Sequence, residues 1–235
     1  MLLSRACHLT VTTLQLLGTT RLDGAASMQL GGGSPVRTLP LDFTDPSVAA
    51  DWLAVDDRIM GGATTSSMVY SDADGATRFE GNLIVEGGGF ASVRFGPALE
   101  LNAGVEALAV EARGDGRMGY KVTLTSAAAP MGVSYQCTLP PLRQDAFERV
   151  KLPLAQFRPS FRGRAAPEAP ALRAADVTGL GLMLSRYAAE GSDVAAKVDI
   201  APGPFALQLR RLEAAESDLA INGRRWVQAR ARGGP

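Results

Sequence analysis

Histidine and cysteine are almost absent from this chain. His8 is the single histidine, and Cys7 and Cys137 are the two cysteines among 235 residues. If the N-terminal segment is removed, the remaining chain has no histidine and one cysteine. It then contains no internal disulfide, no Ser-His-Asp or Cys-His catalytic group and no histidine-ligated metal. These absences exclude most hydrolase and metalloenzyme mechanisms and leave carboxylates, Lys, Tyr or Arg for any catalysis.

Net charge and long apolar runs are lacking as well. The chain has 24 basic and 24 acidic residues, so its formal charge is zero. A general nucleic-acid-binding protein needs an excess of positive charge, so we expect no nucleic-acid partner. No apolar run reaches the roughly 18 residues of a membrane-spanning helix, so we also expect no transmembrane segment.

Acidic residues are missing from the start of the chain, where the first is Asp23. On a helix, Leu2 and Leu9 share an apolar face, and basic and hydroxyl side chains lie opposite. This pattern is typical of an organelle transit peptide, although a secretory signal and an uncleaved start remain open. The run GGGSP at 31–35 predicts a flexible joint. We therefore assign residues 1–40 to a transit-like leader and joint.

Aromatic residues are few, whereas 26 glycines and 14 prolines supply many turns. From Leu41 onward, short runs alternate apolar and polar residues, and no convincing helix-period segment of ten or more residues interrupts them. A sheet that is buried on one face produces this alternation. The runs predict eight strands, at 77–85, 87–95, 107–112, 120–126, 132–139, 147–154, 177–185 and 204–212.

Eight regularly spaced strands predict an all-β fold, an antiparallel β-sandwich of jelly-roll type. We expect the sandwich to span residues 41–213. Cys137 falls on the apolar side of its strand, so we expect a buried, inert thiol. A short helix is predicted over Glu213 to Ala220, at the start of a basic tail at 214–235.

The stretch RGDGRMGY, residues 113–120, matches two short motifs. Its glycines follow the G-x-G-x-x-G pattern of dinucleotide-binding loops, and its first three residues spell the RGD adhesion tripeptide. A dinucleotide loop precedes a helix and has an acid about 20 residues further on, whereas this stretch lies between two strands and lacks that acid. We interpret it as a hairpin turn in which Gly114 and Gly116 adopt positive φ and Asp115 caps the turn. Arg113 and Asp115 are expected to pair with charged loops nearby.

The stretch DDRIMGG, residues 56–62, combines two acids, an arginine and two glycines. One interpretation is a strand-entry loop whose Asp–Arg pair forms a surface ion pair worth less than about 1 kcal/mol. The other is a site in which Asp56 or Asp57 binds a cation or a sugar. Calcium would need more oxygen ligands than this segment supplies.

The stretch FRPSFRGR, residues 157–164, concentrates Arg158, Arg162 and Arg164 beside two phenylalanines. Guanidinium groups next to aromatic rings suit binding to a carboxylate, a phosphate or a protein surface. The alternative is that these arginines pair with the acids of DDRIMGG within the fold.

Six segments occur in the order found in the complex I intermediate-associated protein 30 family: DDRIMGG, GGGFASVR, RGDGRMGY, LPLAQFRPSFRGR, GLGLML and GPFALQL. From about Asp42 to Leu212, the chain therefore resembles this family. The resemblance implies a galactose-binding-like β-sandwich, similar to carbohydrate-binding modules. It also implies a non-enzymatic assembly factor or chaperone for mitochondrial NADH:ubiquinone oxidoreductase, with no catalytic residues, metal or cofactor.

The implied partners are protein subunits of a membrane complex or other assembly factors, and the chain would be peripheral to an organelle membrane. The mitochondrion is the expected address. Family members linked to plastid complexes make a plastid photosynthetic-complex assembly factor the alternative. Carried over by position, the resemblance identifies candidate binding or fold-fingerprint residues: Asp57, Arg58, Gly61, Gly62, Arg94, Arg113, Asp115, Arg162 and Arg164.

The implied fold leaves a second function open, that of a carbohydrate-binding module. Sugar-binding platforms usually display several aromatic rings, and this chain has two Trp and four Tyr. A glycan-binding protein of this kind would lose binding on substitution of Trp52, Tyr70 or Tyr135.

Overall fold

The computed structural model describes residues 35–57, 61–186 and 200–216. Strands make up most of this part of the chain. Short 3-10 helices lie between some of them: η1 (Pro46–Asp51), η3 (Leu154–Gln156) and η4 (Ala174–Asp176). In η1, Asp45 caps the first turn because its side chain accepts the Ser47 N–H, and Pro46 occupies the first helical position, where no N–H is needed.

The first of two large sheets has seven strands, and every neighbouring pair is antiparallel. Its order is β13-β12-β10-β9-β14-β6-β3. The strands are β13 (Arg164–Ala165), β12 (Arg158–Phe161), β10 (Val133–Thr138), β9 (Tyr120–Ser126), β14 (Val177–Ser185), β6 (Phe90–Phe95) and β3 (Trp52–Ala54).

The second large sheet has six strands, also antiparallel. Its order is β11-β8-β15-β5-β4, and β2 also pairs with β15. The strands are β11 (Glu148–Pro153), β8 (Val105–Arg113), β15 (Gly203–Glu216), β5 (Ala76–Leu83), β4 (Thr65–Ser71) and β2 (Leu41–Asp42). A separate parallel pair joins β1 (Val36–Thr38) to β7 (Ala98–Glu100).

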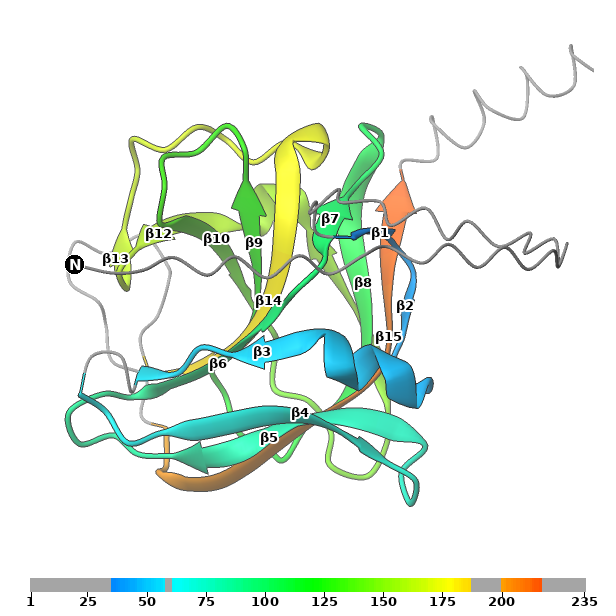
Figure 1. Ribbon diagram of the computed structural model, residues 1–235, viewed down its shortest axis with the longest axis vertical. Helices are drawn as coiled ribbons and strands as arrows, with labels where there is room; N and C mark the ends of the chain where they lie inside the picture. Colours follow the sequence, from blue (N-terminus) through cyan, green and yellow to red (C-terminus); the bar gives the residue numbers. More distant parts are fainter. Residues whose placement is uncertain (1–34, 58–60, 187–199, 217–235) are drawn as a thin grey trace, which may run out of the picture. The chain divides into compact units, whose positions relative to one another are not determined.

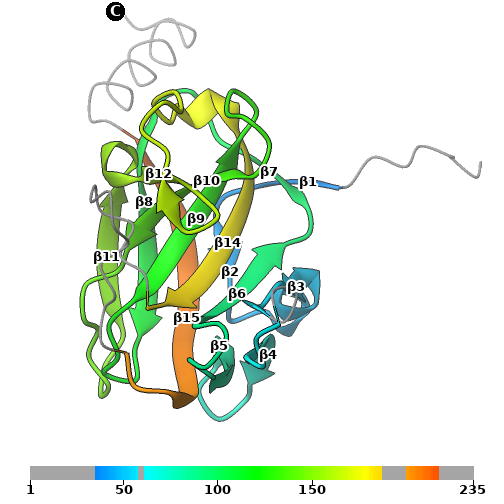
Figure 2. The same ribbon diagram turned by 90° about the vertical axis from the view of Figure 1, so that its left-hand side faces the viewer.

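The apolar faces of the two sheets form one core. Phe79 and Leu207 of the six-stranded sheet and Val122 and Leu124 of the seven-stranded sheet are completely buried. Figure 1 shows the two sheets, and in Figure 2 β9 and β14 lie in front of β8 and β15. Each large apolar side chain buried in this way contributes about 1.5–3 kcal/mol. The all-β, antiparallel β-sandwich predicted from the sequence is confirmed.

The predicted strands are all present, as β5, β6, β8, β9, β10, β11, β14 and β15. Cys137 is buried, as expected. The helix predicted over Glu213 to Ala220 is wrong in its described part, because β15 continues to Glu216. Pairing with β8 keeps this segment extended despite the helix propensity of its alanines and glutamates. The leader, the rest of the tail and Trp226 lie outside the described residues.

Candidate functional site

Asp57 is fully buried where two loops meet. Its Oδ1 accepts the Thr64 backbone N–H at 3.1 Å, and its Oδ2 accepts the Thr64 hydroxyl at 2.9 Å and the Gly89 N–H at 2.8 Å. A Cβ on Gly62 or Gly88 would lie 2.3 or 2.0 Å from this carboxyl group. Glycine at both positions therefore leaves the space that the carboxylate fills.

The neighbouring residue, Asp56, connects the two large sheets. Its Oδ1 accepts the Ser66 hydroxyl at 2.5 Å and the Ser92 N–H at 3.0 Å, so it joins β4 to β6. The surface position expected for the acids of DDRIMGG is wrong, because Asp56 and Asp57 are both buried. Their carboxylate oxygens accept hydrogen bonds from backbone and side-chain groups of the sandwich. Gly61 adopts a φ of +89°, and Arg58 lies outside the described residues.

The RGDGRMGY stretch crosses from one sheet to the other. It links β8 of the six-stranded sheet to β9 of the seven-stranded sheet, so the hairpin turn expected here is wrong. Gly116 has a φ of +84°, whereas Gly114 is not among the glycines with positive φ. A Cβ on Gly114 would lie 2.9 Å from Leu142 Cβ. Close packing, rather than backbone conformation, is therefore the reason for glycine at 114.

The Asp115 carboxylate caps this crossover. Its Oδ1 accepts the Arg117 N–H at 3.0 Å, and its Oδ2 accepts the Tyr120 hydroxyl at 2.9 Å and the Ala206 N–H at 3.1 Å. Ala206 precedes Gln208, the first residue of β15 that pairs with β8, so the carboxylate satisfies a donor that β8 does not reach. Burial, together with the charge of Asp115, raises the pKa of Tyr120 far above its ordinary value, so the hydroxyl stays protonated and donates.

Arg113 pairs with an acid nearby, as expected. Its guanidinium lies 2.8 Å from Asp74 and donates through Nε to Gln208 at 2.9 Å. Arg78 binds the same Asp74 carboxylate. The hydroxyl of Ser71, followed by the hydrogen bond from Arg78, holds the pKa of Asp74 below its ordinary value of 3.8. Asp74 thus connects β8 with the β4–β5 turn.

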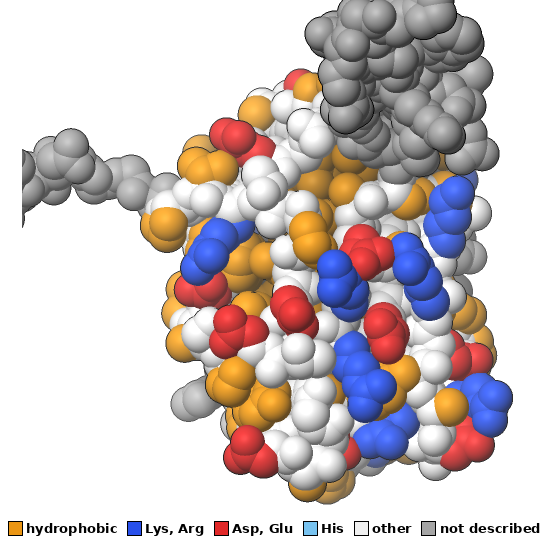
Figure 3. All heavy atoms as spheres, turned by 90° about the vertical axis from the view of Figure 1, so that its right-hand side faces the viewer, with side chains coloured by type: hydrophobic (Ala, Val, Ile, Leu, Met, Phe, Trp, Pro, Cys, Tyr) orange, Lys and Arg blue, Asp and Glu red, His pale blue; other side chains and the backbone are white. Residues whose placement is uncertain are grey.

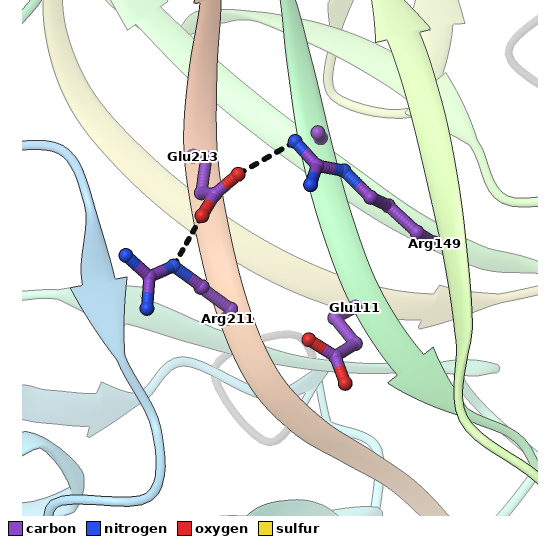
Figure 4. Close-up of a pocket in the computed structure, with 5 residues that line it drawn as sticks. Glu111, Arg149, Arg211 and Glu213 are labelled. Atoms are coloured by element: carbon purple, nitrogen blue, oxygen red, sulfur yellow. Dashed lines mark hydrogen bonds and ion pairs between the residues drawn. The ribbon is translucent and has the colours of Figure 1, made fainter.

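Ion pairs continue across the outer face of the six-stranded sheet, where basic and acidic side chains alternate (Figure 3). Arg149 of β11 lies 2.6 Å from Glu213 of β15, and Arg211 pairs with the same carboxylate. With Ala109 and Glu111, these side chains line a small hollow (Figure 4). Arg149 and Arg211 therefore share one carboxylate partner within the sheet.

Arg162 lies in the two-residue turn between β12 and β13, and Arg164 begins β13 as the cross-strand partner of Phe161. The Arg162 guanidinium carbon is 5.2 Å from the centroid of the Phe161 ring. Within the described ranges, neither arginine forms an ion pair. The alternative that these arginines pair with the acids of DDRIMGG is wrong, since those carboxylates bind other groups.

Arg94 is exposed on the outer face of the seven-stranded sheet and lies opposite Gly181 of β14. Sequence reasoning did not identify the polar side chains that share this face. Lys121 and Gln136 are buried there, and the Lys121 ammonium donates to Gln136 at 3.3 Å. The sequence feature that could have identified them is the set of alternating polar positions in β9 and β10, which by itself indicates only a solvent-facing side of each strand.

The aromatic rings proposed for sugar stacking are mostly inside the fold. Trp52 is 7% exposed, with its ring centroid 5.3 Å from that of Phe95, and Tyr135 is 1% exposed. The Tyr135 hydroxyl donates to the Pro170 carbonyl at 2.6 Å. Only Tyr70 of the three is partly accessible. Trp52 and Tyr135 therefore cannot stack on a glycan in this structure.

The candidate residues lie in separate places. One is the Asp57 junction with Gly61 and Gly62, the second is the Arg113–Asp115 crossover, and the exposed arginines lie elsewhere on the seven-stranded sheet. Among the described residues, no group of three or more His, Cys, Asp or Glu side chains is placed to hold a metal ion. No helix within the described ranges is long and apolar enough to cross a membrane.

Several solved structures are similar to this chain at low identity. A family 11 carbohydrate-binding module of the Clostridium thermocellum cellulase Lic26A-Cel5E shares 11% identity at a TM-score of 0.48, over 76% of this chain and 96% of that one. CsCBM6-3 from Clostridium stercorarium, in complex with cellobiose, shares 11% identity at a TM-score of 0.39, over 79% and 99%. The agarase AgWH50C shares 12% identity at 0.43, over 75% and 26%.

A comparison with curated protein sequences finds no match. The family model described as complex I intermediate-associated protein 30 matches residues 41–209. This range contains the Asp57 junction, the Arg113–Asp115 crossover and the β12–β13 turn, and it covers most of the chain. The resemblance suggested by the six ordered segments is confirmed, and the chain belongs to the complex I intermediate-associated protein 30 family.

Proposed function

We propose that this protein is a non-enzymatic assembly factor for respiratory complex I that holds partly assembled subunits or other assembly factors. The family match over residues 41–209 carries the proposal. The engagement of Asp57 and Asp115 supports a role without catalysis, because each carboxylate accepts several hydrogen bonds that join parts of the fold. The burial of Trp52 and Tyr135 favours a protein partner over a glycan.

The direct test is co-migration on native gels. The protein is tagged, organelles are solubilised with a mild detergent, and the tag is located relative to complex I assembly intermediates. We expect the tag to migrate with a complex I subunit in an intermediate and to be absent from the mature complex. Free migration of the tag, together with normal complex I after removal of the gene, would contradict the proposal.

The address follows from the same proposal, because complex I subunits assemble in the mitochondrion. The acid-free first 22 residues are the sequence feature that supports organelle import. Fusion of residues 1–40 to a fluorescent protein should direct the fusion to mitochondria. Accumulation in plastids would instead support the photosynthetic-complex alternative, and secretion would contradict both.

A further inference from the structure

Two turns at one end of the seven-stranded sheet place apolar and basic side chains together on the surface. β10 begins after the turn that contains Met131, and Val133 at its start pairs with Phe161 at the end of β12. Met131 is 98% exposed and Phe161 is 41% exposed. We call Met131, Phe161, Arg162 and Arg164 the β12–β13 tip.

The ring of Phe161 is held in place although it is exposed. It lies against Gly132, where an added Cβ would be 3.0 Å from the ring. Gly132 adopts a φ of +87°, so both the conformation and the space at this position favour glycine. Arg162 stacks near the same ring. A side chain fixed in this way loses little rotamer freedom when a partner binds.

Arg162 occupies a backbone conformation that arginine seldom adopts. Its φ is +51°, followed by +76° at Gly163, and Arg162 is the single non-glycine residue with positive φ in the described part of the chain. A two-residue hairpin turn of this kind favours Asn, Asp or Gly at both positions. The sequence therefore keeps an arginine where a smaller residue would make a more stable turn, which indicates a use for its side chain beyond the turn.

The charge around the tip is positive. Between Arg158 and Glu168 the chain has three arginines and one acid, and the facing turn at 126–132 has no charged residue. Within the described ranges, Arg162 and Arg164 have no acidic partner, in contrast to Arg149 and Arg211 on the other sheet. Guanidinium groups without an internal acid are available to carboxylates from another molecule.

We propose that the β12–β13 tip docks an acidic segment of a partner protein. Carboxylates of that segment bind Arg162 and Arg164, and an apolar side chain of the segment packs on Met131 and Phe161. Methionine, aromatic residues and arginine are the types enriched in protein interfaces, so the composition of the tip fits a protein partner. The inference rests on the proposed assembly function for the identity of that partner as a complex I subunit or another assembly factor.

Site-specific photo-crosslinking tests the proposal in the full chain. A benzoylphenylalanine is placed at position 131 and, as a matched control, at position 53, because Leu53 is 64% exposed at the opposite edge of the same sheet. Both variants are produced in cells whose organelles are assembling complex I. The organelles are irradiated, and the crosslinked proteins are digested for mass spectrometry. We expect crosslinks from position 131 to a protein segment with net negative charge, and none to that segment from position 53.

Charge reversal then tests the arginines. The double substitution Arg162→Glu with Arg164→Glu should lower the yield of the crosslink from position 131 by roughly ten-fold or more, since hot-spot residues dominate binding. Arg37→Glu, at an exposed arginine of β1 outside the seven-stranded sheet, should leave the yield unchanged. Circular dichroism and the melting temperature of each variant confirm that it folds.

The outcomes separate this inference from the proposed function. If the tagged protein co-migrates with complex I intermediates but the double variant crosslinks as the unmodified protein does, the docking surface is wrong and the function stands. If the acidic segment belongs to a protein unrelated to complex I, the docking surface stands and the function is wrong. The docking proposal would be overturned if position 131 gave no crosslink. It would also be overturned if position 131 crosslinked to protein segments without net negative charge or to membrane lipid.

Discussion

The charged residues that the family resemblance identified as candidates behave in opposite ways in two regions of the molecule. At the Asp57 junction and the Arg113–Asp115 crossover, carboxylates are directed inward and accept hydrogen bonds from backbone and side-chain donors. At the β12–β13 tip, Arg162 and Arg164 are directed outward and have no acidic partner in the described part of the chain.

This difference separates residues that maintain the fold from residues available for binding. A buried carboxylate with several donors is costly to remove, because its partners are left without an acceptor. An exposed arginine without a partner contributes little to folding and is free to bind another molecule. Substitutions in the first region should therefore change stability, and substitutions in the second should change binding.

Asp57→Asn should have the largest effect on stability. The amide nitrogen of the new side chain would face either the Thr64 or the Gly89 N–H, so a buried donor loses its acceptor. We expect the free energy of unfolding to fall by about 3 kcal/mol. Urea denaturation measures it, with the exposed Asp72→Asn as control. Equal stability of the two variants would remove the distinction between the regions.

Tyr120→Phe should have an intermediate effect. It removes one hydrogen bond to the Asp115 carboxylate and leaves the apolar ring in place. Because a bond to a charged group is stronger than a neutral one, we expect a loss of about 1.5 kcal/mol in the free energy of unfolding. Tyr70→Phe is the matched control, and a comparable loss there would mean that the crossover has no special role.

Asp74→Asn should change how stability depends on pH. The folded-state pKa of Asp74 is lowered, chiefly by the Ser71 hydroxyl and by Arg78, so its carboxylate stabilises the fold above its ordinary pKa of 3.8. That contribution is lost as the pH falls from about 4 through the folded-state pKa. Between about pH 5 and about pH 2, the free energy of unfolding should decline less steeply in the variant than in the unmodified protein, as measured by denaturation. An unchanged pH profile would contradict the role of Asp74 between β8 and the β4–β5 turn.

Arg162→Gly should have the smallest effect on folding and the opposite sign. Glycine adopts the φ of +51° without steric cost, so the free energy of unfolding should rise by up to about 1 kcal/mol. Arg158→Gly, in the strand beside it, should instead lower stability slightly. A loss of stability in Arg162→Gly would show that the side chain is needed by the fold itself.

The fold was predictable because its signal is local. Alternation within β9, β10 and β14 identifies strands with one apolar face, and the structure buries Val122, Tyr135 and Leu182 on that face. β12 was missed because it is four residues long and contains Pro159. β4 also alternates in burial, but its many small polar residues give too weak an apolar pattern to predict a strand.

The positions of the charged residues were less predictable because they depend on pairing over long distances. The Asp57 carboxylate binds the N–H of Gly89, 32 residues further along the chain, and no local pattern identifies that donor. The same limit explains the error at RGDGRMGY, since a glycine-rich link between two strands looks alike whether it forms a hairpin or crosses between sheets. The grouping of arginines beside Phe161 could be suggested by composition, but the lack of an acidic partner for Arg162 and Arg164 among the described residues needed the structure.

The most direct measurement is complementation of complex I assembly. Cells that lack the protein are supplied, at matched levels, with the unmodified chain, the Arg162→Glu/Arg164→Glu double variant or Arg37→Glu, and assembled complex I is quantified on native gels. We expect the unmodified chain and Arg37→Glu to restore complex I, whereas the double variant is folded and soluble but does not restore it. Normal complex I without the protein, or full restoration by the double variant, would contradict it.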